Sequence, residues 1–178
     1  MRTFIAIDIP EEIKERIIDI QKKLPEFKGK ITEKENLHLT LKFLGEVDEK
    51  KLGKIKNKLR EIKINSFGTD IDSIGFFDNR RGYRKQLIIW LHMTNCDELQ
   101  KQIDSKLETL FEKEKRFMAH LTIARIKEIK NDKKFFAELN KIKIPKMNFI
   151  IEKFYLKKSV VRRPGPIYEN LETYRLKI

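Results

Sequence analysis

The stretches His38-Leu39-Thr40-Leu41 and His120-Leu121-Thr122-Ile123 nearly repeat each other and decide how the chain folds. Each lies in an apolar run with the period-two alternation of a β-strand, Leu37–Leu44 and Phe117–Ile126. Alternate side chains of a strand share a face and lie roughly 7 Å apart. The histidine and threonine of each motif therefore face one way, while the apolar residues between them face a core. A cleft between two such strands would hold two imidazoles with a hydroxyl beside each, which suits metal-free acid–base chemistry on a phosphate ester.

The composition indicates one globular domain. The chain has 178 residues, of which 40% are hydrophobic, and no run approaches the length of a membrane span. The apolar stretch at residues 3–9 is broken by Asp8, so we expect a first strand and not a signal peptide. Cys96 is the single cysteine, which excludes an internal disulfide and a cysteine-based zinc site. These features favour a cytoplasmic protein.

The charge balance is strongly basic. Forty Lys and Arg against 27 Asp and Glu leave a net charge of +13. An excess of this size favours a polyanionic partner, with nucleic acid first and an anionic membrane surface second. For any single lysine, a solvated surface position explains the charge equally well.

Strand and helix patterns alternate along the chain without a linker. They predict an α+β fold with mostly antiparallel sheets and two related halves, divided near residue 80. We expect helices at about residues 10–24, 49–62, 97–112 and 133–141, and strands at about 3–9, 37–44, 67–76, 86–93, 117–126, 149–161 and 169–178.

The paired motifs must be weighed against simpler interpretations. A single His-x-Thr on an apolar strand is most often a partly buried, hydrogen-bonded histidine, but two copies in corresponding places favour a function. His92-Met93-Thr94 is a third copy, followed by a turn and helix-cap cluster, so we interpret His92 as a structural residue at a strand end. A catalytic zinc needs a third protein ligand, and neither motif contains Asp, Glu or Cys. We therefore expect neither a metal nor a cofactor.

The chain resembles the two-histidine phosphoesterase superfamily, and within it the LigT-like RNA 2′,3′-cyclic phosphodiesterases, also called 2′-5′ RNA ligases. The resemblance runs nearly from end to end. Its motifs are Arg2-Thr3-Phe4-Ile5-Ala6-Ile7, Asn36-Leu37-His38-Leu39-Thr40-Leu41-Lys42-Phe43-Leu44-Gly45, Ala119-His120-Leu121-Thr122-Ile123-Ala124-Arg125 and Gly165-Pro166-Ile167-Tyr168-Glu169-Asn170-Leu171. The flanking Lys-Phe-Leu-Gly and Ala-Arg point to the LigT-like branch.

The resemblance implies a bilobal, pseudo-twofold fold with both motifs facing one cleft. It also implies hydrolysis of RNA 2′,3′-cyclic phosphate ends, tRNA fragments among them, to a 2′-phosphate, with His38 as the proton donor and His120 as the proton acceptor. The reverse reaction would make a 2′-5′ linkage. We expect a monomer that needs no membrane and no obligate protein partner. Two alternatives remain: a non-catalytic basic RNA-binding protein, and a phosphodiesterase acting on a small cyclic phosphate.

Four further residues are candidate substrate ligands. Thr40 and Thr122 can donate hydrogen bonds to the non-bridging phosphate oxygens. Arg125 is a candidate phosphate ligand or a structural ion pair, although strand alternation puts it on the opposite face from Thr122 unless the strand bends. Lys42 shares the predicted face of His38 and Thr40, where it would contact phosphate or lie at a solvated rim.

Two basic segments are candidates for RNA contacts or for solvated surface. The loop at residues 79–85 carries three arginines around Tyr83, a combination that suits backbone charge and base stacking. The arginines are Arg80, Arg81 and Arg84. The second segment contains Lys157, Lys158, Arg162 and Arg163.

Overall fold

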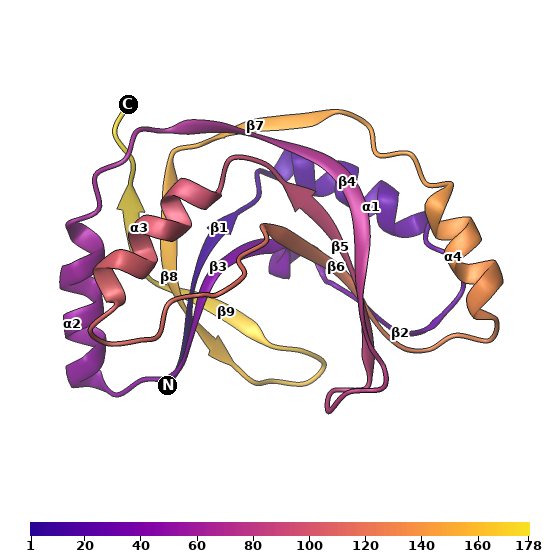
Figure 1. The fold of residues 1–178 in the computed structure, drawn as a ribbon, viewed down its shortest axis with the longest axis horizontal. Coiled ribbons are helices and arrows are strands. Elements are labelled where there is room, and N and C mark those ends of the chain that lie inside the picture. Colours follow the sequence, from indigo (N-terminus) through magenta and orange to yellow (C-terminus); the bar gives the residue numbers. More distant parts are fainter.

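Nine strands form one continuous sheet in the computed structural model, which describes residues 1–178 (Figure 1). The strand order is β7-β4-β5-β6-β3-β1-β8-β9, with β2 added beside β6, and all strand pairs are antiparallel. The strands are β1 (Arg2–Asp8), β2 (Lys28–Ile31), β3 (His38–Glu46), β4 (Phe67–Asn79), β5 (Gln86–Met93), β6 (His120–Glu128), β7 (Met147–Ile151), β8 (Lys153–Val160) and β9 (Ile167–Arg175). The predicted α+β class with antiparallel pairing is confirmed.

Four α-helices and one short 3-10 helix accompany the sheet. They are α1 (Glu11–Lys22), α2 (Glu49–Arg60), α3 (Asp97–Leu107), α4 (Asp132–Asn140) and η1 (Lys34–Asn36). Capping residues explain two of the starts, because Asp48 accepts a hydrogen bond from the backbone N–H of Lys51 before α2, and Asn131 accepts one from Lys134 before α4. None of these helices has the length and apolar character needed to cross a membrane.

Three details differ from the expected elements. The segment at 149–161 contains parts of two strands and not one. β7 pairs with β4 and ends at Ile151, and β8, which pairs with β1, begins at Lys153. Strand β2 is an added short strand that the sequence pattern did not indicate. The expected division near residue 80 falls in the turn between the paired strands β4 and β5, whereas the two halves of the sheet meet between β3 and β6.

The two motif strands meet at the centre of the sheet. β3 and β6 share one paired position, Leu39 opposite Leu121, so the two sheets expected from the sequence are joined into one along a narrow seam. Antiparallel pairing at this point places His38 on the side of Thr122 and Thr40 on the side of His120. The two motifs therefore lie side by side across the seam.

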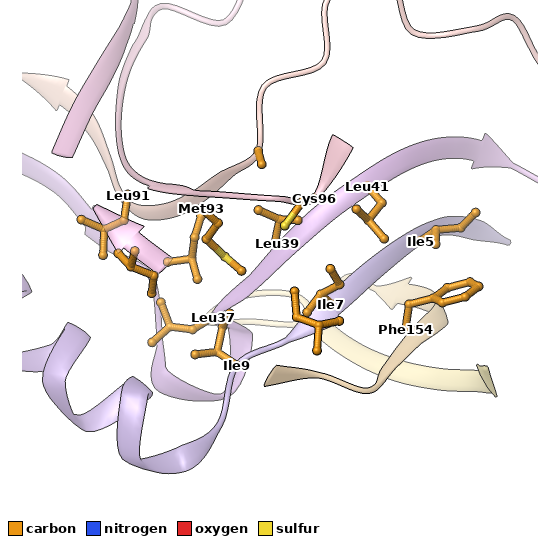
Figure 2. Close-up of a cluster of buried hydrophobic side chains, with 14 of the residues drawn as sticks. Ile5, Ile7, Ile9, Leu37, Leu39, Leu41, Leu91, Met93, Cys96 and Phe154 are labelled. Atoms are coloured by element: carbon orange, nitrogen blue, oxygen red, sulfur yellow. The ribbon is translucent and has the colours of Figure 1, made fainter. Parts of the chain in front are cut away.

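The core lies on the sheet face opposite the histidines. Leu39 and Leu41 point into it and are almost fully buried (Figure 2). Leu121 belongs to the same buried cluster, as the strand alternation predicts. The helices cover this face crosswise, since α1 packs against β6 whereas α3 packs against β3. Each half of the chain thus covers the motif strand of the other half, which locks the two halves together.

Candidate active site

The two motif histidines are held by the same backbone contact. The Nδ1 of His38 lies 2.6 Å from the carbonyl oxygen of Asn36, and the Nδ1 of His120 lies 2.8 Å from that of Met118. A carbonyl oxygen only accepts, so Nδ1 carries the proton and donates it in both rings. The Nε2 atom of each neutral ring is then left as an acceptor. Both rings line one cleft, where each Nε2 atom can accept a proton from a bound ligand and return it.

The two threonines also line this cleft, but only one touches a histidine. The Oγ1 of Thr40 lies 3.0 Å from the Nε2 of His38, so its hydroxyl donates to the neutral ring. The hydroxyl of Thr122 makes no hydrogen bond with the protein and can donate to a ligand. The structure therefore brings together the four motif residues expected at the site.

A β-bulge decides the position of the fifth, Arg125. In β6, Thr122 lies opposite Trp90 and Ala124 lies opposite Ile89, so Ile123 is an additional residue without a partner. The bulge shifts the alternation by one position and turns Arg125 onto the face of His120 and Thr122. Arg125 is exposed there and lines the cleft.

A matching bulge in β3 has the opposite effect on Lys42. Thr40 lies opposite Ala6 and Lys42 lies opposite Ile5, so Leu41 is the additional residue. The bulge turns Lys42 into the core, where it is only 3% exposed, and brings Phe43 into the cleft instead. The expectation that Lys42 shares the face of His38 and Thr40 is wrong for this reason.

Lys42 belongs to a buried polar network outside the cleft. Its Nζ donates to Asp104 Oδ1 at 2.6 Å and to the carbonyl oxygen of Glu112 at 2.7 Å. Burial alone would raise the pKa of Asp104, but Lys42, Gln100 and the backbone N–H of Glu114 hold it below its usual value. Lys42 therefore ties β3 to α3 and to the segment that leads to the second motif.

Aromatic rings pack against both histidines, and these rings come from strands that are distant in sequence from the motifs. The His38 ring lies 5.1 Å from that of Phe4 and 5.0 Å from that of Tyr168. The His120 ring lies 5.1 Å from that of Phe77 and 6.4 Å from that of Trp90. The sequence patterns do not indicate these residues as site neighbours, although Phe4 and Tyr168 lie within the resemblance motifs.

Gly75 explains how Trp90 fits beside His120. The indole lies directly over this glycine, and a Cβ there would approach the ring to 2.3 Å. The Phe77 ring packs against the indole at a tilt of 44°, with its centroid 5.3 Å from that of Trp90. A glycine two residues before a phenylalanine in a strand was the available signal for this arrangement.

Burial makes both histidines weak bases in the free protein. It lowers the pKa of His38 to about 4; the bond to Asn36 opposes this shift, and the charge of Lys157 adds to it. Burial also lowers the pKa of His120, and the positive charge of Arg125 adds to that effect. Both imidazoles are therefore neutral at pH 7 before a ligand binds.

A partly buried ion pair lies near His38. Lys157 Nζ is 2.8 Å from Asp8 Oδ1 and 2.7 Å from Asn170 Oδ1. Lys157 is 6% exposed and does not line the cleft. Its neighbour Lys158 pairs with Glu169, so the lysines of this basic segment are engaged within the protein.

The cleft has a volume of about 760 Å³ and a positive lining. Its one acidic residue, Glu33, pairs with Lys30 at 2.7 Å. Four arginines that line the cleft make no ion pair with the protein, whereas Arg60 and Arg80, which lie outside it, are each paired with carboxylates. These four are Arg2, Arg84, Arg125 and Arg162.

The two candidate basic segments contribute unequally to this lining. Of the loop after β4, Arg84 reaches the cleft, while Arg80 pairs with Asp78 and Asp132, and Tyr83 is fully exposed. Of the second segment, Arg162 reaches the cleft. Both loops project to the same side of the sheet, at the bottom of Figure 1.

His92 lies beside the site without lining it. It pairs across β5 and β6 with His120, and its Nδ1 is 2.8 Å from Asp72 Oδ1. The structure thus places it at the end of β5, as expected for a structural histidine. No group of three or more His, Cys, Asp or Glu side chains is arranged to hold a metal ion.

Comparison with known proteins places this geometry in a family. The model of the LigT like Phosphoesterase family matches residues 7–87 and 93–168. The chain is 42% identical over 179 residues to an RNA 2′,3′-cyclic phosphodiesterase of Methanocaldococcus jannaschii, with 98% of this chain and 100% of the relative covered. A protein of the same name from Thermotoga maritima is 35% identical, with 96% and 93% covered.

Solved structures agree in both fold and extent. The crystal structure of Escherichia coli LigT complexed with 3′-AMP superimposes with a TM-score of 0.79 at 27% identity, covering 98% of this chain and 97% of that one. The crystal structure of TT0787 of Thermus thermophilus gives a TM-score of 0.79 at 26% identity, with 99% and 98% covered. With the fold, the paired histidines and the family match in agreement, the chain belongs to the LigT-like phosphoesterase family.

Proposed function

We propose that this protein hydrolyses RNA 2′,3′-cyclic phosphate ends to 2′-phosphates by paired histidine catalysis that needs no metal. The observation that carries the proposal is the matched pair of imidazoles, each with Nδ1 bound to a backbone carbonyl and both lining one arginine-rich cleft. Relatives at 42% and 35% identity are named RNA 2′,3′-cyclic phosphodiesterases, which supports the same substrate here.

The reaction needs one base and one acid on opposite sides of phosphorus. His120 Nε2 takes a proton from water, and the water oxygen forms a bond to phosphorus. The bond between phosphorus and the ribose 3′-oxygen breaks, and His38 Nε2 gives its proton to that oxygen. The products are a 2′-phosphate and a free 3′-hydroxyl. Positioned acids and bases of this kind each contribute about 10²–10⁴-fold to a rate.

Three side chains are suited to the charge that develops on the non-bridging oxygens. The free hydroxyl of Thr122 and the guanidinium of Arg125 lie on the same cleft face. Arg125 can bind two phosphate oxygens at once, which lysine cannot do. Thr40 joins them when His38 is protonated, because its hydroxyl is then no longer needed as a donor to Nε2.

The acid role of His38 depends on the substrate. With a pKa of about 4, His38 is neutral in the free protein at pH 7. A bound phosphate brings a negative charge into a partly desolvated cleft, which favours the protonated imidazole and raises its pKa. Substrate binding therefore supplies the condition under which His38 carries the proton that it donates.

Ligation uses the same groups in the same roles. A 5′-hydroxyl replaces water as the nucleophile: His120 takes its proton, its oxygen bonds to phosphorus, the bond from phosphorus to the 3′-oxygen breaks, and His38 protonates that oxygen, which leaves a 2′-5′ linkage and a free 3′-hydroxyl. The ring opening supplies the free energy of the new bond, so no nucleotide cofactor takes part. We propose this ligation as a secondary activity of the same site.

One assay tests the proposed function directly. An oligonucleotide ending in a 2′,3′-cyclic phosphate is incubated with the protein in excess chelator, and the product is identified as a 2′- or 3′-phosphate. We expect chelator-resistant formation of the 2′-phosphate. RNA binding without turnover would instead identify a non-catalytic RNA-binding protein. Turnover of small cyclic phosphates alone would replace RNA as the substrate.

A further inference from the structure

The side chain of Asn36 is held by two acceptors. Its Nδ2 donates to the carbonyl oxygen of Pro166 at 3.0 Å and to Glu33 Oε2 at 3.3 Å. Both partners only accept, so the amide nitrogen, which carries two N–H groups, is the end that faces them. Asn36 is half-buried at the end of η1, two residues before His38. The amide is therefore a fixed part of the structure and not a freely rotating surface group.

This amide belongs to a larger contact between the segment before β3 and the loop that joins β8 to β9. Lys30 Nζ donates to the carbonyl oxygen of Pro164 at 2.8 Å, and Asn36 donates to that of Pro166. Glu33 bridges the two donors, because its Oε1 is 2.7 Å from Lys30 Nζ and its Oε2 accepts from Asn36. The three side chains fasten the β8–β9 loop to the turn that leads into the first motif.

The backbone carbonyl of the same asparagine holds the His38 ring. Its oxygen lies 2.6 Å from Nδ1, while the Thr40 hydroxyl faces Nε2 at 3.0 Å. Moving the proton of the neutral ring from Nδ1 to Nε2 would leave two lone pairs facing each other across the 2.6 Å contact. The protonated position and the orientation of the ring therefore depend on where this carbonyl lies, and the side chain of Asn36 anchors it.

His120 lacks such a second anchor. Met118 supplies a carbonyl oxygen at 2.8 Å, but its side chain has no N–H or O–H to donate. The difference agrees with the two proposed roles. A water molecule can adjust its position to the base, whereas the 3′-oxygen is fixed by the ribose, so the acid must be placed more accurately.

We propose that Asn36 is the positioning residue of the proton donor: its amide, bound to Pro166 and Glu33, keeps its carbonyl on Nδ1 of His38 and so aims Nε2 at the leaving 3′-oxygen. The inference rests on the proposed function and adds to it a residue that acts through His38 and not on the phosphate. It also makes the β8–β9 loop, which brings Arg162 to the cleft, part of the support of the acid.

A change of leaving group isolates the step that this positioning serves. A 3′-oxygen leaves with a proton from His38. A sulfur at the bridging 3′ position leaves as a thiolate without one, since a thiol is a far stronger acid than an alcohol. A defect confined to the acid therefore slows the oxygen substrate and spares the sulfur substrate, whereas a general loss of structure or of substrate binding affects both.

The experiment uses Asn36→Leu, which keeps the side-chain volume and removes both N–H donors. The substrates are two short oligonucleotides ending in a 2′,3′-cyclic phosphate, one with oxygen and one with sulfur at the bridging 3′ position. We expect kcat for the oxygen substrate to fall about tenfold with KM nearly unchanged, and kcat for the sulfur substrate to stay close to the wild-type value. Equal losses for both substrates, or no loss for either, would overturn the assignment. No turnover of either substrate by the wild type would overturn the proposed function instead.

The matched control is Glu35→Ala. Glu35 lies in the same turn, is exposed, does not line the cleft and makes no side-chain hydrogen bond or ion pair. Its kcat should match the wild type with both substrates, and a selective loss equal to that of Asn36→Leu would contradict the assignment. Thermal melts compare the folding of the variants, and Asn36→Ala takes the place of the leucine variant if that one does not fold.

A measurement on the protein alone tests the positioning without turnover. In ¹⁵N-labelled protein, the imidazole nitrogen signals of a neutral histidine show which nitrogen carries the proton. At pH 7 we expect Nδ1–H for His38 in the wild type and a mixture of both tautomers in Asn36→Leu. His120 should keep Nδ1–H in both proteins and is the internal control. An unchanged His38 ring in Asn36→Leu would overturn the proposal, whatever the kinetic result.

Discussion

The strands β3 and β6 have the same burial pattern at all nine positions, yet they give the cleft different chemistry. Both begin with His-x-Thr, both contain a bulge at the residue after the threonine, and both continue into the core. After the bulge, β3 buries Lys42 and exposes Phe43, while β6 buries Ala124 and exposes Arg125. The two strands share the same backbone geometry, but their side chains differ at the two positions after the bulge. The two strands therefore present different chemical groups to the cleft.

The two histidines likewise combine equal backbone contacts with different neighbours. Both use a backbone carbonyl to fix Nδ1–H, but Asn36 also donates through its side chain to the carbonyl oxygen of Pro166 at 3.0 Å. Met118 has no such donor. The His38 side is therefore tied to the segment that leads to Tyr168, while the His120 side depends on Phe77 and Trp90 from its own half of the sheet. The two histidines thus occupy equivalent positions but have different supporting contacts.

The largest expected effect breaks the equivalence of the two histidines. His38→Ala and His120→Ala should each lower kcat/KM for a cyclic phosphate by about 10²–10⁴-fold. With sulfur in place of the 3′ bridging oxygen, the leaving group needs no proton, so His38→Ala should recover most of its loss and His120→Ala should not. Recovery of His120→Ala instead would exchange the two roles.

The next effect separates Lys42 from Arg125. Lys42→Met leaves the Asp104 carboxylate buried without its cation, so the free energy of unfolding should fall by about 3–5 kcal/mol in urea titrations. The double variant Lys42→Met/Asp104→Leu should recover most of that loss. Arg125→Met, at an exposed position, should change the unfolding free energy by about 0.5 kcal/mol or less while losing turnover. A stable Lys42→Met protein with impaired turnover would contradict this division.

The smallest effect concerns pH and the His38 ring. Its pKa is about 4 in the folded protein against 6.5 in an unperturbed histidine, so between these values the unfolded chain binds more protons. The free energy of unfolding therefore rises with pH in this window. The contribution is complete above about pH 6.5 and is lost on acidification, by up to about 1.4 kcal/mol per pH unit. Urea titrations of His38→Gln should show a flatter dependence than the wild type between pH 4.5 and 6.5 by roughly that slope. Identical slopes would mean that His38 is not desolvated.

Local patterns predicted most of the fold and the centre of the site. The apolar stripe of Ile13, Ile17 and Ile20 gives α1, and the β5 strand is observed at its predicted limits, Gln86–Met93. The position of the two motifs on strands followed from alternation alone. In each case the information lies within a few residues of sequence.

The bulges were not predictable in the same way. Leu41 and Ile123 are ordinary strand residues, and the apolar alternation continues through both of them. The shift in register arises from pairing with β1 and β5, which the motif sequences do not contain. For this reason the faces of Lys42 and Arg125 could not be derived from spacing. The aromatic neighbours Phe77 and Trp90 likewise reach His120 through tertiary pairing.

The single paired position between β3 and β6 links folding order to activity. Leu39 and Leu121 are far apart in the sequence, so bringing them together costs more chain entropy than forming either half's hairpins. We expect this junction to close after the local strand pairs have formed. Until it closes, a chain holds one imidazole in each incomplete half and has no site. Recovery of phosphodiesterase activity during refolding therefore reports when this non-local contact has formed, and fluorescence of the single Trp90 reports separately on the half that holds His120.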